Sequence, residues 1–153
     1  MDLLPIPQSG ELPKGMALDE FIQPVMEATV KWYERVGFNP PWMGYLALQN
    51  GQVVGACGFK TAPMAGRVEI AYGTRPGFEG QGVATRMAAE LIRLAQEHDP
   101  KVQVFAQTLP QESASTSLLK KLGFQYIGSV LHPEDGTVWE WELAGGSALT
   151  PSA

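Results

Sequence analysis

The sequence predicts an α+β fold with a mixed sheet flanked by helices. Segments with helical and strand periodicity follow one another in the order helix, hairpin, strand, helix, strand, helix, hairpin. The chain has 153 residues, 44% hydrophobic and 18% charged, which is ordinary for one globular domain. We therefore expect a single domain over residues 1–144 and a disordered tail over residues 145–153, which has little apolar surface to bury.

The first helix is expected from an apolar stripe near the start of the chain. Its first turn is predicted to hold Asp19, Glu20 and a tolerated Pro24, because acidic residues and proline are both accepted there. The residues that recur at helical spacing on one face are Ile22, Val25, Thr29, Trp32 and Val36.

A hairpin is expected directly after this helix. Asn50 and Gly51 lie between two apolar runs, 42–48 and 53–59, and both central positions of a type I′ turn require positive φ. The two runs are therefore predicted to pair as antiparallel strands.

The second half alternates strands with helices and ends in another hairpin. Strands are expected over 68–72 and 102–106, separated by a helix that carries an apolar stripe. That helix is predicted to run from Val83 to a stop near His98. A shorter helix is expected to begin at Ser113 or Ser115 and to stop at Gly123. The last hairpin is predicted to pair residues 126–130 with 137–143 and to place Trp139 and Trp141 on one face.

Small residues mark the loop that precedes the second helix. Gly80, Gly82 and Ala84 would let backbone amides converge on an anion at the positive end of that helix. A nucleoside-triphosphate loop would continue with Lys and Ser or Thr, but Val83 and Ala84 follow here. The glycine order from Gly77 onward is also wrong for a dinucleotide fingerprint. The loop indicates a pyrophosphate site, with a glycine-rich turn that caps an ordinary helix as the alternative.

Three motifs resemble the GNAT superfamily of N-acetyltransferases. Glu79-Gly-Gln-Gly-Val-Ala84 is similar to the R/Q-x-x-G-x-G/A loop with which that family holds the pyrophosphate of acetyl-CoA, mainly through backbone amides. Glu69-Ile-Ala-Tyr72 resembles the E-I-G-Y strand of the branch that includes the ribosomal-protein N-terminal acetyltransferases. The segment from Ser115 to Phe124 resembles the family's S-x-x-x-L-x-K-x-G-F helix. The resemblance covers about residues 42–143 and departs from the family at Glu79, where Arg or Gln is usual.

The resemblance implies a GNAT-like, mostly antiparallel sheet in which two strands splay apart to seat the pantetheine arm of acetyl-CoA. It implies acetyl-CoA as co-substrate and an amine as acetyl acceptor, and it suggests an oxyanion donor among the amides near Gly73. The residues that it assigns to cofactor binding are Gly73, Thr74, Glu79, Gly80, Gln81, Gly82, Val83, Ala84, Thr85 and Ser115.

The same resemblance makes Glu69 the candidate catalytic base, because a lysine-like amine with pKa ~10.4 is almost entirely protonated at neutral pH. The alternative for Glu69 is an exposed strand residue or an ion pair with Arg67 or another basic side chain. The family's usual acid, a tyrosine four residues before Gly-Phe, is replaced by Leu119. Either the thiolate leaves unassisted or a hydroxyl substitutes, and the candidates are Ser115, Tyr72, Tyr126 and Tyr45.

Composition narrows the possible partners. A net charge of −5 without clustered Lys and Arg argues against nucleic acid and suits a cationic acceptor, either a small molecule or a peptide. No apolar run approaches the ~20 residues of a membrane span, and the first residues do not resemble a secretory signal, so a cytoplasmic location is expected. The lone Cys57, His98 and His132 are expected to be structural, and no ligand spacing indicates a metal. A non-catalytic acyl-CoA sensor is the alternative function, and a homodimer is possible.

Overall fold

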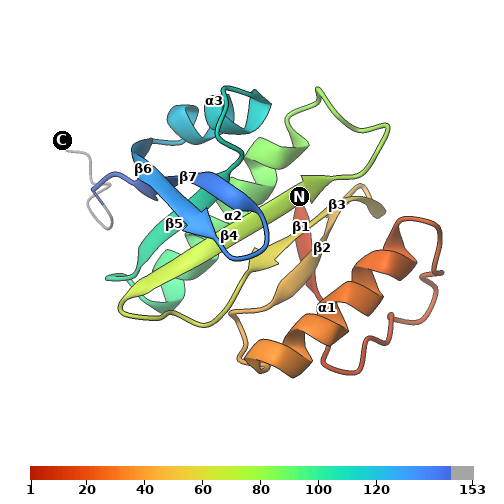
Figure 1. Cartoon of the computed structure of the whole chain (residues 1–153). Coiled ribbons are helices and arrows are strands. Elements are labelled where there is room, and N and C mark those ends of the chain that lie inside the picture. The colour runs from red at the N-terminus through yellow and green to blue at the C-terminus, as the bar shows by residue number, and fades with distance from the viewer. Residues whose placement is uncertain (146–153) are drawn as a thin grey trace.

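The computed structural model describes residues 1–145, and the rest of the expected tail, residues 146–153, lies outside the described residues. Its described elements form one sheet and three helices (Figure 1). They are β1 (Asp2–Pro5), α1 (Ile22–Val36), β2 (Gly44–Gln49), β3 (Gln52–Phe59), β4 (Arg67–Thr74), α2 (Val83–His98), β5 (Gln103–Thr108), α3 (Ala114–Lys121), β6 (Phe124–His132) and β7 (Gly136–Leu143).

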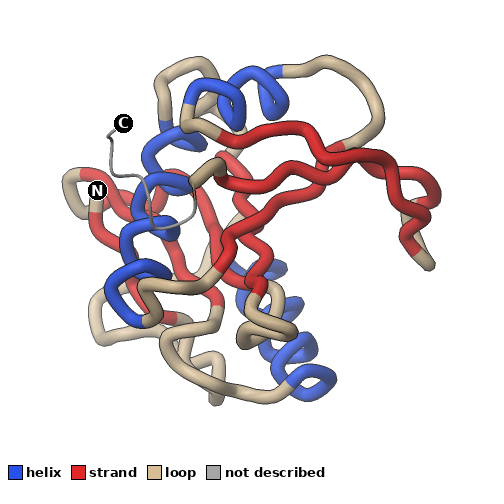
Figure 2. The backbone as a smooth tube through the Cα atoms, turned by 90° about the vertical axis from the view of Figure 1, so that its left-hand side faces the viewer, coloured by secondary structure: helices blue, strands red, loops and turns tan. Residues whose placement is uncertain are grey.

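The sheet is mixed and mostly antiparallel, which confirms the predicted fold class. Its strand order is β1-β2-β3-β4-β5-β7-β6, and only the neighbours β4 and β5 run parallel. Helix α1 lies in front of the sheet in Figure 1, whereas α2 lies behind it against β3 and β4. In the turned view of Figure 2, helices flank the strands on both sides. The sheet therefore has an α1 face and an α2 face.

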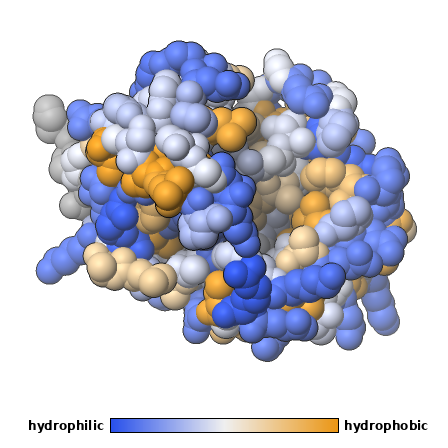
Figure 3. All heavy atoms as spheres, viewed as in Figure 1, coloured by the Kyte–Doolittle hydropathy of each residue, from blue (hydrophilic) through white to orange (hydrophobic). Residues whose placement is uncertain are grey.

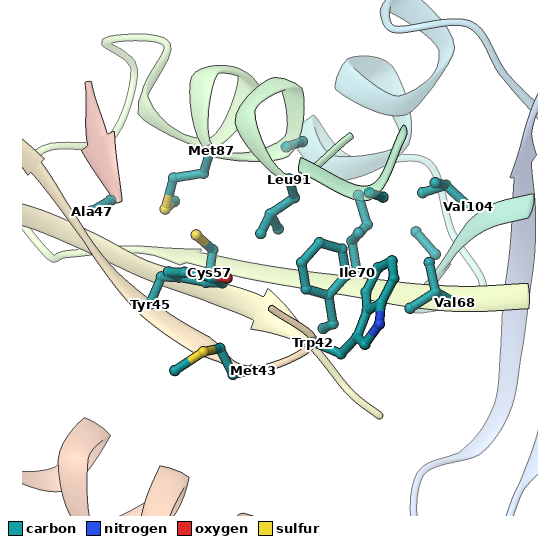
Figure 4. Packing of buried hydrophobic residues seen from close by; sticks show 14 of the residues in the cluster. Trp42, Met43, Tyr45, Ala47, Cys57, Val68, Ile70, Met87, Leu91 and Val104 are labelled. Atoms are coloured by element: carbon teal, nitrogen blue, oxygen red, sulfur yellow. The ribbon is translucent and has the colours of Figure 1, made fainter. Parts of the chain in front are cut away.

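The main core lies between the sheet and α2. The side chains of Met87 and Leu91 point from α2 toward the strands, and both residues are fully buried (Figure 4). Val68 and Ile70 of β4 face them and are no more than 2% exposed. Burying each such side chain contributes roughly 1.5–3 kcal/mol, so this layer fixes the position of β4 against α2.

The elements agree with the sequence prediction within a few residues, with two corrections. Asp19 and Glu20 both lie before α1 and not in its first turn. The Oδ1 atom of Asp19 accepts hydrogen bonds there from the N–H groups of Phe21 and Ile22. Strand β1 was not predicted, because it has four residues, ends in Pro5 and lies at the sheet edge, where periodicity is weak. The Asn50-Gly51 turn has the positive φ values that the sequence predicted, 53° and 77°.

Candidate active site

Strands β4 and β5 separate halfway along their length. Their parallel pairing ends at Glu69 and Phe105. Beyond that point β4 pairs with β3 as far as Thr74, whereas β5 pairs with β7 as far as Thr108. The edges that β4 and β5 turn toward each other are thus unpaired over several residues. We call this opening the β4–β5 gap, and it confirms the splayed strands that the resemblance implied.

The backbone of β4 turns alternate residues toward the β4–β5 gap. The carbonyl of Glu69 accepts a hydrogen bond from the N–H of Lys60, and the N–H of Arg75 donates to Val54, so odd-numbered residues face β3. The N–H and C=O groups of Ile70, Tyr72 and Thr74 therefore face the gap. Gly73, expected to bind the cofactor, points its polar backbone groups toward β3. A Cβ placed on Gly73 would meet no atom within 4 Å.

The glycine loop leads from β4 into α2 and presents free backbone amides. Gly80 and Gly82 both have left-handed φ values, 77° and 78°, and Gly82 caps α2 without a side-chain cap. Gln81 closes a turn over Glu79 and Gly80, and among the described residues no acceptor is found for the N–H groups of residues 79, 80 and 82–85. A Cβ on Gly80 would meet nothing within 4 Å. Because Val83 has a buried side chain, only its backbone is available at this surface.

Two charged side chains hold the loop in this shape. The Oε1 atom of Glu79 accepts a hydrogen bond of 2.8 Å from the N–H of Gly77, so the acidic side chain is engaged within the loop itself. One Nη atom of Arg86 donates to the carbonyl of Gln81 and to the side chain of Gln49. This guanidinium places positive charge beside the free amides, and sequence reasoning missed it.

Glu69 lies near the narrow end of the β4–β5 gap with its side chain 17% exposed. Burial raises the pKa of this carboxyl above its ordinary value, although Lys60, whose Nζ lies 3.9 Å from Oε2, opposes the shift. Arg67 does not pair with it, since the guanidinium binds the carboxylates of Glu140 and Glu142. The sequence left open an ion pair of Glu69 with Arg67 or with another basic side chain, and the cation that lies beside it is Lys60.

A hydroxyl pair joins β4 to α3. The Oη atom of Tyr72 lies 2.9 Å from the Oγ atom of Ser115. Burial raises the pKa of Tyr72, while its hydrogen bond with Ser115 lowers it. Ser115 is free for this contact because Ser113, the other expected cap, forms the capping box of α3 with Thr116.

The remaining hydroxyl candidates lie elsewhere. Tyr45 donates to the carbonyl of Pro41, and burial raises its pKa to about 12. Tyr126 is half-exposed beside Ser129 on β6. Leu119 is completely buried in the core and lines neither cavity described below. Tyr72 is thus the tyrosine that combines a position at the gap with a hydroxyl partner on α3.

Two cavities meet at β4. The larger, about 500 Å³, lies between α1 and strands β3 and β4, and the molecular surface is hollowed at the centre of Figure 3. The smaller, about 250 Å³, lies at the β4–β5 gap and is lined by Glu69, Tyr72 and Ser115 among others. Lys60, Ala71 and Tyr72 line both cavities. The two cavities are therefore neighbours along β4.

A family model described as an acetyltransferase (GNAT) domain matches residues 14–125. The chain belongs to the GNAT acetyltransferase family. This membership confirms the predicted enzyme class, an acetyltransferase that uses acetyl-CoA as co-substrate. It also explains why the loop, the β4–β5 gap and α3 occur together in one chain.

Solved structures share the fold of this GNAT chain at low identity. The RimL ribosomal L7/L12 α-N-protein acetyltransferase in complex with coenzyme A is 14% identical, with a TM-score of 0.66. The match covers 92% of this chain and 91% of that chain. Ribosomal-protein-alanine N-acetyltransferase from Brucella melitensis is 22% identical, with a TM-score of 0.59 and coverages of 83% and 79%. YncA from Salmonella typhimurium with acetyl-CoA is 22% identical, with a TM-score of 0.60 and coverages of 77% and 72%. A search of curated proteins gave no significant match.

The other residues that the sequence singled out in this GNAT chain lie in structural contacts. The sulfur of Cys57 points toward Met87 in the core, and burial raises its pKa to about 12, which leaves an unreactive thiol (Figure 4). His98 packs edge-on against Trp42, and Nδ1 of His132 accepts from the N–H groups of its own turn. Within residues 1–145 there is no cluster of potential metal ligands and no helix long and apolar enough to cross a membrane.

Proposed function

We propose that this chain transfers the acetyl group of acetyl-CoA to a primary amine by direct attack within a ternary complex. The observation that carries the proposal is the β4–β5 gap, which opens beside a loop of free backbone amides. Residues that bind a thioester and residues that move protons are thereby brought to one strand, β4. Glu69 and Tyr72 lie only three positions apart on it.

The residues present fit coenzyme A at this site. The amides of residues 80–85 lie at the N-terminus of α2, and a Cβ on Gly80 would meet nothing within 4 Å, so a diphosphate bound there would gain hydrogen bonds and a favourable helix dipole. The backbone groups of Tyr72 and Thr74 face the gap and can pair with the amides of a pantetheine arm, as an added strand would. Gly73, predicted to bind the cofactor, turns its backbone groups toward β3 and lines the larger cavity instead of the one at the gap. Ser115 lies at the α3 side of the same gap.

Glu69 is the proposed base. When bound, acetyl-CoA supplies a thioester carbonyl carbon, to which the amine nitrogen forms a bond while the carbon–sulfur bond breaks. Glu69 takes a proton from the substrate ammonium, directly or through a water, and so frees the nitrogen lone pair for attack; its carboxylate borders both the gap and Lys60. Its burial raises its pKa and so makes it a stronger base than an exposed glutamate.

Tyr72 is the proposed acid for the leaving thiolate. Its raised pKa keeps the hydroxyl protonated at neutral pH, and Ser115 holds it at the wall of the gap. The N–H of Tyr72 also faces the gap and can donate to the carbonyl oxygen as negative charge develops there. One residue thus supplies both a proton and a backbone donor, and its N–H is one of the amides near Gly73 that the resemblance suggested.

Binding and turnover must be measured separately, because an acyl-CoA sensor would bind without reacting. Leu119 and Glu79, which depart from the family pattern, favour that alternative. Purified protein is titrated with acetyl-CoA by calorimetry, and release of the CoA thiol is followed over a panel of amines. Binding with amine-dependent thiol release is the expected result. Binding without release for any amine would establish the sensor, and no binding would overturn both functions.

Location and assembly belong to the same proposal. The single unpaired Cys57 suits the reducing cytoplasm, and we place the enzyme there. A primary amine is the acceptor, carried either by a small molecule or by a peptide. A homodimer stays a prediction, which light scattering of the purified chain would test.

A further inference from the structure

The larger cavity exists because the sheet beneath α1 lacks large side chains. Pairing places Gly58 opposite Ala71 and Ala56 opposite Gly73, so these four residues share the α1 face. Gly44 of β2 pairs with Gly58 and extends the same small-residue floor. The Tyr33 hydroxyl anchors helix α1 beside this floor, because it donates to the carbonyl of Ile6 and accepts from the N–H of Gly44 on β2. A volume of about 500 Å³ remains, which is the size of a small-molecule site.

The walls of this larger cavity are apolar. Phe21, Val25, Ala28 and Trp32 come from α1 and the segment before it. Among the described residues that line the cavity, none is acidic, and Lys60 is the one side chain charged at neutral pH. Beyond Phe21, the carboxylate of Asp19 is already paired with Arg75 at 2.8 Å. The cavity therefore suits an apolar group and offers an anion a single partner.

Lys60 lies where the two cavities meet. It lines both of them, and its Nζ is 3.9 Å from the carboxylate of Glu69. An amine that attacks in the β4–β5 gap must approach this same place, because Glu69 takes its proton there. An anionic group bound by Lys60 would thus lie within a few bonds of the reacting nitrogen.

Resting on the proposed acetyl transfer, we propose that the acceptor is a free α-amino acid with a large apolar side chain. Its side chain fills the larger cavity, its carboxylate pairs with Lys60, and its ammonium faces Glu69. The four charges then alternate in sign and sum to zero, so none is buried without a partner. When Glu69 takes the proton, two neutral groups and the Lys60–carboxylate pair remain.

The same electrostatics disfavours the cationic acceptors that the net charge of −5 had suggested. A polyamine or an aminoglycoside would bring extra positive charges next to Lys60 and into walls that carry no carboxylate. A peptide N-terminus would present a neutral amide to Lys60 instead of a carboxylate. Both classes lose the ion pair, and the polycations add repulsion.

Matched acceptors test the assignment. Rates of CoA thiol release are compared for phenylalanine, for phenethylamine, which lacks the carboxylate, for phenylalaninamide and for spermidine. We expect kcat/KM for phenylalanine to exceed that of each other amine by about tenfold or more, the usual size of a charge-assisted pair. In Lys60→Met the phenylalanine advantage over phenethylamine should fall to about twofold or less. The readout is the ratio of kcat/KM for phenylalanine to kcat/KM for phenethylamine, because any effect of Lys60 on the pKa of Glu69 acts on both amines.

Spermidine as the best acceptor, or equal rates for phenylalanine and phenethylamine, would overturn the proposal. If no amine releases thiol, the proposed transfer fails, and calorimetric binding of phenylalanine to the wild type and to Lys60→Met decides this site by itself. Phenylalanine binding to the wild type that is lost in Lys60→Met supports the amino-acid site. Binding to neither protein, or equal binding to both, would overturn it. Ala28→Trp, which fills the cavity from an exposed helix position, should weaken phenylalanine binding about tenfold. Glu34→Trp, exposed on the same helix away from the cavity, is the control.

Discussion

The hydroxyl oxygens of Tyr72 and Ser115 lie 2.9 Å apart and connect β4 to α3. Tyr72 lies directly opposite Cys57 in the β3–β4 pair, so its side chain shares the α2 face with that buried cysteine. Glu69 is an odd number of residues away on the same strand and therefore points to the α1 face. The proposed base and acid thus lie on opposite faces of the sheet, with the β4–β5 gap between them. An amine can enter from one face while a thiol leaves toward the other.

Removing the Tyr72 hydroxyl should slow turnover without weakening cofactor binding. Tyr72→Phe is expected to lower kcat by about tenfold to a hundredfold, at the low end of general acid catalysis, because a thiolate is already a good leaving group. The dissociation constant of acetyl-CoA should change by less than about twofold, since the backbone of Tyr72 is retained. Steady-state kinetics and calorimetry measure the two effects. Tyr126→Phe is the matched control, because that hydroxyl pairs with Ser129 on an exposed strand and lines neither cavity. Equal kcat in wild type and Tyr72→Phe would show that the thiolate leaves unassisted.

Glu69→Gln should replace the acidic limb of the pH–rate profile that reports Glu69 with one that follows the pKa of the acceptor amine. In the wild type, kcat/KM falls as the pH falls and Glu69 becomes protonated, and burial places this limb above the ordinary glutamate range. Since Lys60 lowers this pKa, Lys60→Met should move the limb to higher pH. Glu69→Gln is expected to lose about a hundredfold in rate with an amine of high pKa and less with a weakly basic amine.

Stability separates this role of Glu69 from a structural one. Because its pKa is raised in the folded state, ionisation of Glu69 costs stability as the pH rises from the unfolded carboxyl's pKa through the folded value. Glu69→Gln should therefore melt at an equal or higher temperature than the wild type at pH 7. Glu142→Gln, which weakens an ion pair of Arg67, should leave the rate unchanged. A lower melting temperature for Glu69→Gln with a normal rate would make Glu69 structural.

The local parts of the site could be predicted from the sequence. Gly80 and Gly82 lie two positions apart immediately before an amphipathic helix, and their left-handed φ values follow from local backbone sterics. The Asn50-Gly51 turn is of the same kind, because two adjacent residues determine its conformation. Such features depend on neighbours in the chain, so they can be recognised before any tertiary contact is known.

The contacts between distant residues could not be predicted. Tyr72 and Ser115 are 43 positions apart, and only the packing of α3 beside β4 shows that their hydroxyls meet. Lys60 faces Glu69 because of the β3–β4 register, and a shift of one residue would turn the two side chains to opposite faces. The larger cavity depends in the same way on small residues of separate strands coming onto one face.

Gly80 offers a test of the loop that separates backbone strain from cofactor contact. Alanine at a left-handed φ costs about 1–2 kcal/mol wherever it occurs. Gly80→Ala and Gly51→Ala share a φ of 77° and open space around the new Cβ, so their melting temperatures should fall by similar amounts. Only Gly80→Ala should raise the acetyl-CoA dissociation constant, by about tenfold, because its methyl group occupies the space before the free amides. A similar affinity in both variants would place the diphosphate elsewhere.

Asp19, which pairs with Arg75 at the start of the glycine loop, should make the stability of the protein depend on pH. A hydrogen bond from the N–H of Ile22, and then the guanidinium of Arg75, hold the pKa of Asp19 below its ordinary 3.8. A lowered folded pKa contributes stability above the unfolded value, and that stability is lost as the pH falls through the folded value. Asp19→Asn should therefore melt below the wild type at pH 7, and the difference should shrink toward pH 3. Glu20→Gln, at an 88% exposed side chain, should show little difference at either pH. An Asp19→Asn difference that is constant with pH would assign the effect to packing.

Leu119 occupies the position of the usual GNAT tyrosine, and restoring that tyrosine should not restore an acid. Leu119 is completely buried and lines neither cavity, whereas Ser115, one turn earlier on α3, lines the smaller one. A tyrosine at position 119 would overpack the core at about 1–3 kcal/mol and leave a buried hydroxyl without a partner. Leu119→Tyr should therefore melt several degrees lower, and adding it to Tyr72→Phe should not raise kcat. Recovery of kcat in the double variant would contradict this prediction. It would mean that α3 can turn residue 119 toward the β4–β5 gap, and that a tyrosine there can protonate the leaving thiolate as well as Tyr72 does.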